Sequence, residues 1–392
     1  MRIAFYAPLK APSHGTPSGD RLVAALFVEA LQQAGHRVEL ASSFRSYDGE
    51  GSAARQLALR AQGLEAARRL VARWRGGPEA GRPDLWFTYH VYYKAPDWLG
   101  PSASAALGIP YVIAEGSYAP KRAGGRWALG HEGSGEAIQR ADLLISPTRF
   151  DLGCLETLVA HRERILLLPP FLDPQLFRAA ALAREAHRAK LAAAHGMDAD
   201  VPWIVVAAMM RPGDKAASYR ELAAVLARVA DLRWHLLVAG DGAARSEVKA
   251  AFDSVVPGRA RLLGILSQKG VAAMYAAGDL CVWPAINEAY GMAMLEAQAA
   301  GVGVVSCAER GVPDVVLDGR TGLLAPPGDT ETLAHLVRKL LLDPQRRAAM
   351  GRAASEFVAG ERSLGAAAVR LDQALARVRT GAAAPNVAAT TN

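Results

Sequence analysis

Twelve short apolar segments divide this chain, and helix or turn signals lie between consecutive segments. Apolar runs of this length predict buried strands, and the helices between them predict right-handed βαβ units and parallel sheets. The pattern therefore predicts an α/β fold with two Rossmann-like domains that face a central cleft. The segments are Ile3–Ala7, Arg37–Ala41, Leu85–Tyr89, Tyr111–Ala114, Leu143–Ser146, Ile165–Leu168, Trp203–Met209, His235–Val238, Ala260–Leu263, Leu280–Trp283, Val302–Cys307 and Gly322–Ala325.

The length of 392 residues favours two domains of similar size. The proline-rich segment Pro169–Pro174, with the Ala/Arg-rich helix after it, marks the connection. We predict an N-terminal domain over residues 1–178 and a C-terminal domain over residues 179–362. A helix at about 363–380 can pack back on the N-terminal domain, and the polar tail 381–392 is expected to be disordered.

Composition excludes several classes of protein. The chain is 51% apolar and 21% charged, which is typical of a globular enzyme. Its net charge of +7 is spread over both halves, whereas nucleic-acid-binding proteins usually concentrate their positive charge, so no nucleic-acid partner is expected. The cysteines Cys154, Cys281 and Cys307 lack the paired spacing of disulfide frameworks or zinc sites, which favours a reducing compartment.

No apolar run approaches the roughly 20 residues that a membrane-spanning helix needs, and the N-terminal apolar run is too short for a signal peptide. We therefore expect a cytoplasmic protein, either free or at the inner face of the membrane. One basic stretch bears on this choice. Between residues 55 and 75, six arginines lie among apolar residues that would share one face of a helix. Contact with an anionic membrane and an ordinary partly exposed helix both fit this pattern.

Glu288 and Glu296 flank a predicted junction between a strand and a helix. The apolar run Leu280–Trp283 ends at a proline, and the next helix is expected to begin near Gly291 and to end at Gly301. Free backbone N–H groups and the positive end of the helix collect at such a junction, where open α/β sheets bind ligands. Two glutamates near a helix are usually solvated, but this context favours a ligand site.

Arg211 and Lys215 follow the first predicted strand of the second half. They are expected at the carboxyl end of that strand, on the same side as the Glu288 loop. A guanidinium group with forked hydrogen bonds and an ammonium group as a point charge could together hold a diphosphate without a metal ion. The alternative is a surface turn with two solvated charges.

Three glycine-containing turns also follow predicted strands. The loop His14–Asp20 contains Gly19, which would let the backbone approach an anion at the start of the first helix. This loop lacks the G-x-G-x-x-G pattern, which weakens a nicotinamide interpretation. The turns Val238–Gly242 and Gly264–Ser267 could bring the backbone up to a flat base, but plain turns explain them equally well.

Taken together, these residues resemble the retaining GT-B glycosyltransferases of family 4. The span from Glu288 to Glu296 matches the E-x7-E motif of that family. The resemblance is strongest over about 203–343 and is fainter but continuous through the N-terminal half. Further similar segments are Met274–Asp279, Glu296–Gly301, Gly311–Asp314 and Gly319–Leu323.

The resemblance implies transfer of a sugar from a nucleotide-sugar donor, with retained configuration and no metal cofactor, in glycan, glycolipid or glycoside assembly. The N-terminal domain would bind a small-molecule, glycan or lipid-linked acceptor, and the C-terminal domain would bind the donor. Glu288 would hydrogen-bond hydroxyls of the donor sugar, and Glu296 would hold the ribose diol. Arg211 and Lys215 would stabilise the leaving diphosphate. The remaining implied donor contacts are Gly19, Leu266, Tyr290, Gly291, Met292 and Ala293.

The acceptor side departs from the family pattern. Family members often have a histidine after the strand that Tyr111–Ala114 resembles, and here that place holds Glu115. Glu115 could orient an acceptor hydroxyl, act as a base or cap its loop. His90, at the end of Leu85–Tyr89, could face the same cleft or be a structural histidine.

Other functions on the same fold are a sugar-phosphate synthase, a phosphorylase and a non-catalytic, two-lobed sugar-binding protein. A secreted binding protein would need an export signal, and a silent scaffold would be expected to have lost Glu288, Arg211 or Lys215. Both considerations favour the enzyme.

Overall fold

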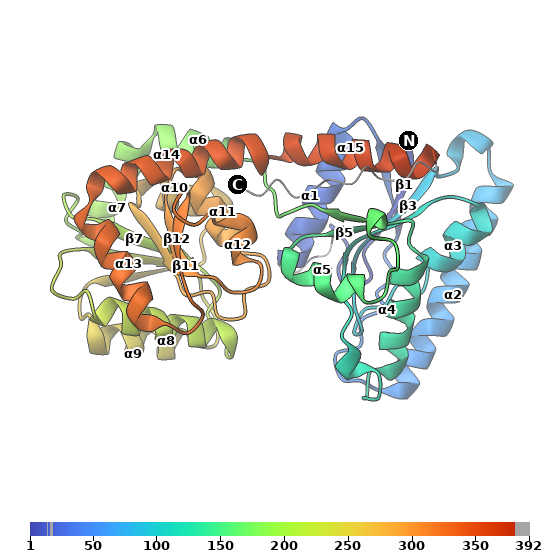
Figure 1. The fold of residues 1–392 in the computed structure, drawn as a ribbon, viewed down its shortest axis with the longest axis horizontal. Coiled ribbons are helices and arrows are strands. Elements are labelled where there is room, and N and C mark those ends of the chain that lie inside the picture. The colour runs from blue at the N-terminus through green and yellow to red at the C-terminus, as the bar shows by residue number, and fades with distance from the viewer. Residues whose placement is uncertain (14, 16–18, 381–392) are drawn as a thin grey trace. The chain divides into compact units, whose positions relative to one another are not determined.

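The computed structural model describes residues 1–13, 15 and 19–380, which form two compact units (Figure 1). The first unit contains Met1–Pro169 and the helix that begins at Leu364, and the second unit contains Pro170–Ser363. The boundary thus lies at Pro169/Pro170 instead of after residue 178. The reason is that helix α6 (Gln175–Leu182) packs on helix α10 (Gln268–Ala277) and places Phe177 in the core of the second unit.

The first unit is built on a six-stranded parallel sheet with the order β2-β1-β3-β4-β5-β6. The central strand β3 is buried along almost its whole length, as expected for a parallel sheet with both faces covered. One face packs on α2, α3, α4 and α5, and Phe27 of α1 contacts Phe87 on the other face, at 5.7 Å between ring centroids. Helix α15 packs against α1. The elements are β1 (Arg2–Tyr6), α1 (Gly19–Gln33), β2 (Arg37–Ser42), α2 (Ala53–Gly76), η1 (Glu79–Gly81), β3 (Leu85–Val91), α3 (Gly100–Leu107), β4 (Tyr111–Gly116), η2 (Pro120–Arg122), α4 (Ala128–Arg140), β5 (Leu143–Ser146), α5 (Arg149–Glu156), η3 (Arg162–Arg164), β6 (Ile165–Leu167) and α15 (Leu364–Thr380).

The second unit repeats this plan with a six-stranded parallel sheet in the order β12-β11-β10-β7-β8-β9. The strand β10 lies near the middle of the sheet and is fully buried. Besides α6 and α10, the elements are α7 (Arg184–His195), β7 (Trp203–Ala207), α8 (Asp214–Ala227), β8 (His235–Ala239), α9 (Arg245–Val255), β9 (Ala260–Gly264), β10 (Leu280–Trp283), α11 (Met292–Ala299), β11 (Val304–Cys307), α12 (Val312–Val315), β12 (Gly322–Ala325), α13 (Thr330–Leu342) and α14 (Pro344–Glu361).

All twelve predicted strands are present, and the α/β class with two Rossmann-like domains is confirmed. Three strands are shorter than predicted, since β6 ends at Leu167, β7 ends at Ala207 and β11 begins at Val304. The predicted disordered tail, 381–392, lies outside the described residues.

Helix α2 carries the six arginines of the basic stretch on an exposed face, while Leu70, Val71 and Trp74 pack in the core of the first unit. Arg68 and Arg69 pair with Glu65, at 2.7 and 3.3 Å. These contacts are those of a partly exposed helix. Within the described residues, no helix combines the length and apolar character that crossing a membrane requires.

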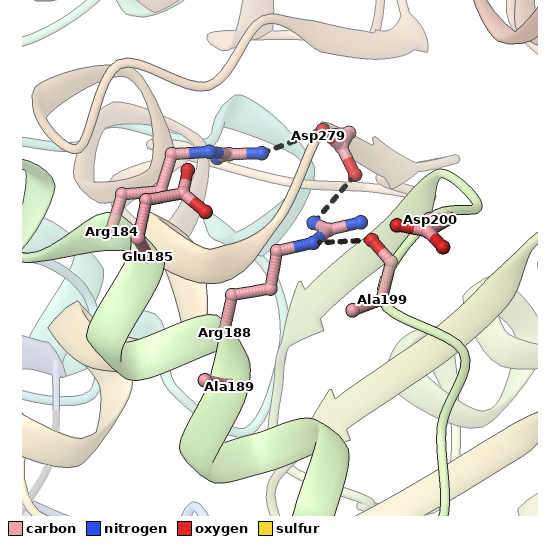
Figure 2. A pocket seen from close by; sticks show the side chains of 7 residues that line it. All are labelled: Arg184, Glu185, Arg188, Ala189, Ala199, Asp200 and Asp279. Atoms are coloured by element: carbon pink, nitrogen blue, oxygen red, sulfur yellow. Dashed lines mark hydrogen bonds and ion pairs between the residues drawn. The ribbon is translucent and has the colours of Figure 1, made fainter.

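A charge cluster joins helix α7 to the turn before β10, beside a surface pocket (Figure 2). Asp279 accepts hydrogen bonds from Arg184 at 2.6 Å and from Arg188 at 2.9 Å, and it also accepts one from the backbone N–H of Trp203 at 2.8 Å. Arg188 donates further hydrogen bonds to the carbonyls of Ala199, Ala277 and Val201. Asp279, Arg184 and Arg188 therefore hold neighbouring segments together, which is a structural role.

We expect Asp279→Ala to destabilise the protein by roughly 3–5 kcal/mol, because the buried guanidinium group of Arg188 and the partly exposed one of Arg184 lose their carboxylate partner. The loss is the difference between the free energies of unfolding of the wild-type protein and the variant, measured by urea denaturation. Asp253→Ala, which removes the exposed ion pair with Lys249 on α9, is the matched control and should cost about 0.5 kcal/mol or less. Equal losses in the two variants would contradict the structural role.

Candidate functional site

The loop from β10 to α11 has a strained backbone. Ala285 and Asn287 have φ angles of 61° and 54°, which residues other than glycine rarely adopt. Two hydrogen bonds to α8 hold this loop, one from the N–H of Ile286 to Ser218 Oγ at 3.1 Å and one from Asn287 Nδ2 to Asp214 Oδ2 at 2.9 Å. Strain held in this way is concentrated at ligand-binding and catalytic sites.

Within this loop, Glu288 forms an ion pair with Lys215. The distance from Lys215 Nζ to Glu288 Oε2 is 2.5 Å, and the two side chains are 34% and 18% exposed. Lys215 comes from the first turn of α8, and its Nζ lies 5.6 Å from the centre of the Trp283 ring at the end of β10. The structure thus brings together two predicted site residues from the carboxyl ends of two adjacent strands, β7 and β10.

Arg211 lies in the loop between β7 and α8, where its side chain is exposed. The loop is tight, because Gly213 has a φ of 85° and the N–H of Ala216 bonds to the Arg211 carbonyl at 3.0 Å. The turn Val238–Gly242 packs against this loop, since a Cβ at Gly242 would lie 2.3 Å from the Met210 carbonyl oxygen. Its glycines therefore allow two loops to approach closely.

The start of α11 presents backbone donors that have no acceptor within the helix. An α-helix leaves its first N–H groups without an intrahelical acceptor, and at α11 these belong to Gly291, Met292 and Ala293. Gly291 has a φ of 76°, and a Cβ there would lie 2.8 Å from both Met294 and Val315. Glycine is required at this position for both reasons.

Glu296 lies on the second turn of α11 and is partly buried. Burial disfavours the charged carboxylate and raises its pKa from 4.5 to about 7. A carboxyl group with this pKa changes its protonation state near neutral pH, so any ligand that needs the carboxylate form will bind in a pH-dependent manner.

The other predicted donor contacts come from separate segments of the chain. Leu266 follows β9 and packs against the core of the second unit, next to Ile265, which is 84% exposed. Tyr290 is partly buried in the β10–α11 loop. Gly19 is exposed at the start of α1 in the first unit, and residues 14 and 16–18 of its loop lie outside the described residues. A donor contact by Gly19 stays a prediction.

The first unit brings His90 and Glu115 together at the ends of β3 and β4. His90 Nε2 lies 3.6 Å from Glu115 Oε1, and His90 Nδ1 lies 3.1 Å from Asp20 Oδ1 at the start of α1. Both His90 and Glu115 have positive φ angles, 62° and 61°. Asp20 was not among the predicted site residues. Its place in the first turn of a helix that follows a glycine loop was the only available signal.

Burial opposes the protonation of His90, but the nearby carboxylates of Glu115, Asp20 and Asp151 outweigh it and raise the pKa of the imidazole. The hydrogen bond from His90 in turn lowers the pKa of Asp20. His90 therefore carries a positive charge over more of the neutral pH range than an isolated histidine. Across the described residues, no group of three or more His, Cys, Asp or Glu side chains is arranged to hold a metal ion.

The raised pKa of Glu296 predicts a pH-dependent effect of Glu296→Gln. Between pH 4.5 and 7 the folded protein binds the proton more tightly than the unfolded chain does, so wild-type stability falls as pH rises through this window. The variant has no carboxyl group at this position, so its stability does not fall in this way. Its melting temperature should exceed that of the wild type by more at pH 8 than at pH 5, with a change of up to about 3 kcal/mol in the stability difference.

Differential scanning calorimetry at the two pH values measures this difference. The matched control is Glu356→Gln, an exposed position on α14 of the same unit, which should change the stability little at either pH. A stability difference for Glu296→Gln that does not vary with pH would contradict the burial of the carboxyl group.

Part of the second unit matches a known family model. Residues 201–343 match the family model described as glycosyl transferases group 1. A D-inositol 3-phosphate glycosyltransferase of Streptomyces avermitilis is 30% identical over 296 residues, covering 70% of this chain and 62% of the relative. An alpha-D-kanosaminyltransferase of Streptomyces kanamyceticus is 31% identical over 188 residues, covering 48% of each chain. The chain thus spans between about half and three fifths of the length of these relatives.

Solved structures agree over nearly the whole chain. Sucrose-phosphate synthase from Thermosynechococcus elongatus superimposes with a TM-score of 0.72 and 20% identity, covering 97% of this chain and 100% of that one. Anabaena HepE, solved in complex with UDP, gives a TM-score of 0.72 and 16% identity, covering 96% and 100%. At these identities the likeness establishes the fold, which is GT-B.

Proposed function

We propose that the protein is a glycosyltransferase, because the chain has the GT-B fold and residues 201–343 match the family model described as glycosyl transferases group 1. It moves a sugar from a nucleotide-sugar donor to an acceptor hydroxyl, with retention of the anomeric configuration. The relatives named as glycosyltransferases support this reaction class. The structures of HepE with UDP and with UDP-glucose favour a nucleoside diphosphate sugar as the donor.

The observation that carries the proposal is the 2.5 Å ion pair between Lys215 and Glu288 beside the start of α11. Glu288 orients the ammonium group of Lys215, and its carboxylate can still accept hydrogen bonds from hydroxyls of the donor sugar. The free N–H groups at the start of α11 bind the donor phosphates, since the N-terminal end of a helix favours anions. Glu296, one turn further along the helix, accepts hydrogen bonds from the ribose diol.

The chemistry follows from where charge develops. As the bond between the anomeric carbon and the phosphate oxygen breaks, negative charge builds on the diphosphate and positive charge on the sugar ring. Lys215 and Arg211 stabilise the diphosphate, and such preorganised groups contribute several kcal/mol to lowering a barrier. The acceptor oxygen attacks from the face that the diphosphate leaves, and a phosphate oxygen takes its proton.

Neither Glu288 nor Glu296 acts as a nucleophile in this scheme. Two side-chain cations and the helix end supply the positive charge that the diphosphate needs, so we propose that the transfer requires no metal cofactor. The acceptor is a small molecule, a glycan or a lipid-linked sugar. A cytoplasmic location, with contact to the inner face of the membrane through the exposed arginines of α2, belongs to the same proposal.

Lys215→Ala and Glu288→Gln should each fold normally and lower kcat/KM by roughly 100- to 1,000-fold, because each removes a preorganised group at the developing charges. Release of nucleoside diphosphate from the donor, followed with a coupled assay, measures the effect. Lys249→Ala, which removes an exposed lysine of the same unit, is the control and should keep its activity. Near-normal activity of the Lys215 or Glu288 variant would overturn the proposed site.

A further inference from the structure

Four side-chain rings in the first unit form a series in which each ring contacts the next, from His90 to Trp127. The ring centroids of His90 and Tyr92 are 4.8 Å apart, those of Tyr92 and Tyr93 are 5.5 Å apart, and those of Tyr93 and Trp127 are 5.6 Å apart. The series begins where Asp20 and Glu115 meet His90. It therefore links the carboxylates at the end of the sheet to a second group of side chains around Trp127.

Three cations surround the Tyr93–Trp127 pair. Lys94 Nζ lies 4.8 Å from the centre of the Trp127 ring, and the guanidinium carbon of Arg122 lies 5.0 Å from that of Tyr93. Arg126 lies 5.6 Å from the Trp127 ring. Cation–π contacts attract these groups to the rings but do not neutralise their charge. Within the described residues none of the three forms an ion pair with a carboxylate.

Backbone contacts fix this cationic cluster, which consists of Tyr93, Lys94, Arg122, Arg126 and Trp127. The indole N–H of Trp127 donates to the carbonyl of Asp48 at 3.1 Å, and the N–H of Asp48 donates to the carbonyl of Lys94 at 2.8 Å. Gln56 Nε2 donates to the carbonyl of Arg126 at 2.8 Å. A Cβ at Gly130 would lie 2.1 Å from the Tyr93 carbonyl oxygen, so this glycine permits the close approach of the two segments.

The cluster also holds an unused donor. The Nε atom of Arg122 is buried and has no hydrogen-bond partner in the part of the chain that the structure describes. A buried donor without a partner costs free energy, and a guanidinium group is well matched to phosphate or carboxylate oxygens. Because the surrounding backbone is already ordered, an anion that binds there meets a reduced entropic cost.

We infer that the cationic cluster binds the anionic group of the acceptor, so that the acceptor is a sugar or polyol that carries a phosphate or a carboxylate. The acceptor hydroxyl then lies toward the other end of the ring series, where Asp20 and Glu115 can accept its hydrogen bond. Opposite charges at the two ends orient the acceptor. This inference rests on the proposed glycosyl transfer and names its acceptor class.

The test measures binding to the full-length protein without catalysis. Two-dimensional NMR of the tryptophan indole N–H groups, with the Trp127 signal assigned by Trp127→Phe, is recorded during titration with three probes: glucose 6-phosphate, glucose and inorganic phosphate. We expect glucose 6-phosphate to shift the Trp127 signal, glucose to leave it in place, and inorganic phosphate to act only at higher concentration. The double variant Lys94→Gln/Arg122→Gln should weaken glucose 6-phosphate binding at least roughly tenfold.

Arg73→Gln is the matched control, because its guanidinium carbon also lies over a tryptophan ring of the first unit, 5.2 Å from the centre of Trp74, but outside the cluster. It should leave the affinity unchanged. Equal affinities for inorganic phosphate and glucose 6-phosphate would reveal an adventitious ion only and overturn the inference, as would a Trp127 signal that no probe shifts. If vesicles of phosphatidylglycerol shift the signal and glucose 6-phosphate does not, the anion belongs to a lipid headgroup and the soluble acceptor is excluded.

A donor-binding measurement on the same sample distinguishes failure of the acceptor inference from failure of the proposed function. If a nucleotide-sugar raises the melting temperature while no anion shifts the Trp127 signal, the acceptor inference fails and the glycosyltransferase proposal stands. If no nucleotide-sugar binds, the proposed function itself fails.

Discussion

Parallel strand direction is the constraint on which both units depend. In a parallel sheet the carboxyl ends of all strands lie along one edge, so loops that are distant in sequence meet there. In the second unit this edge brings Lys215, which follows β7, within 2.5 Å of Glu288, which follows β10. In the first unit it brings His90, near the end of β3, beside Glu115, near the end of β4. Each unit thus assembles its charged groups by the same geometry.

The two units use charge in different ways. In the second unit the Lys215 ammonium group and the start of α11 create a positive environment, which suits a diphosphate. In the first unit carboxylates surround His90 at one end of a series of rings, and three cations surround Trp127 at the other end. The proposed donor site would stabilise a leaving anion, and the proposed acceptor site would orient a charged substrate.

The sequence predicts most of the fold because strands buried on both faces of a parallel sheet read as uninterrupted apolar runs. It also predicts that Lys215 and Glu288 share an edge, because both follow such runs. It does not predict the partnership of His90 with Asp20, 70 residues away, or the cations around Trp127, because these depend on how loops pack. The domain boundary was misplaced because the burial of Phe177 against the second unit leaves no local signal.

The central claim is that the edge of the second sheet, around Lys215 and Glu288, binds a nucleotide-sugar. Thermal melting of the wild-type protein in the presence of UDP-, GDP-, ADP- and TDP-sugars tests it most directly. One of these donors at about a hundred times its Kd should raise the melting temperature by about 5 °C or more. The same donor should have little effect on Lys215→Ala. Stabilisation by none of the donors, or equal stabilisation of the Lys215→Ala variant, would contradict the account.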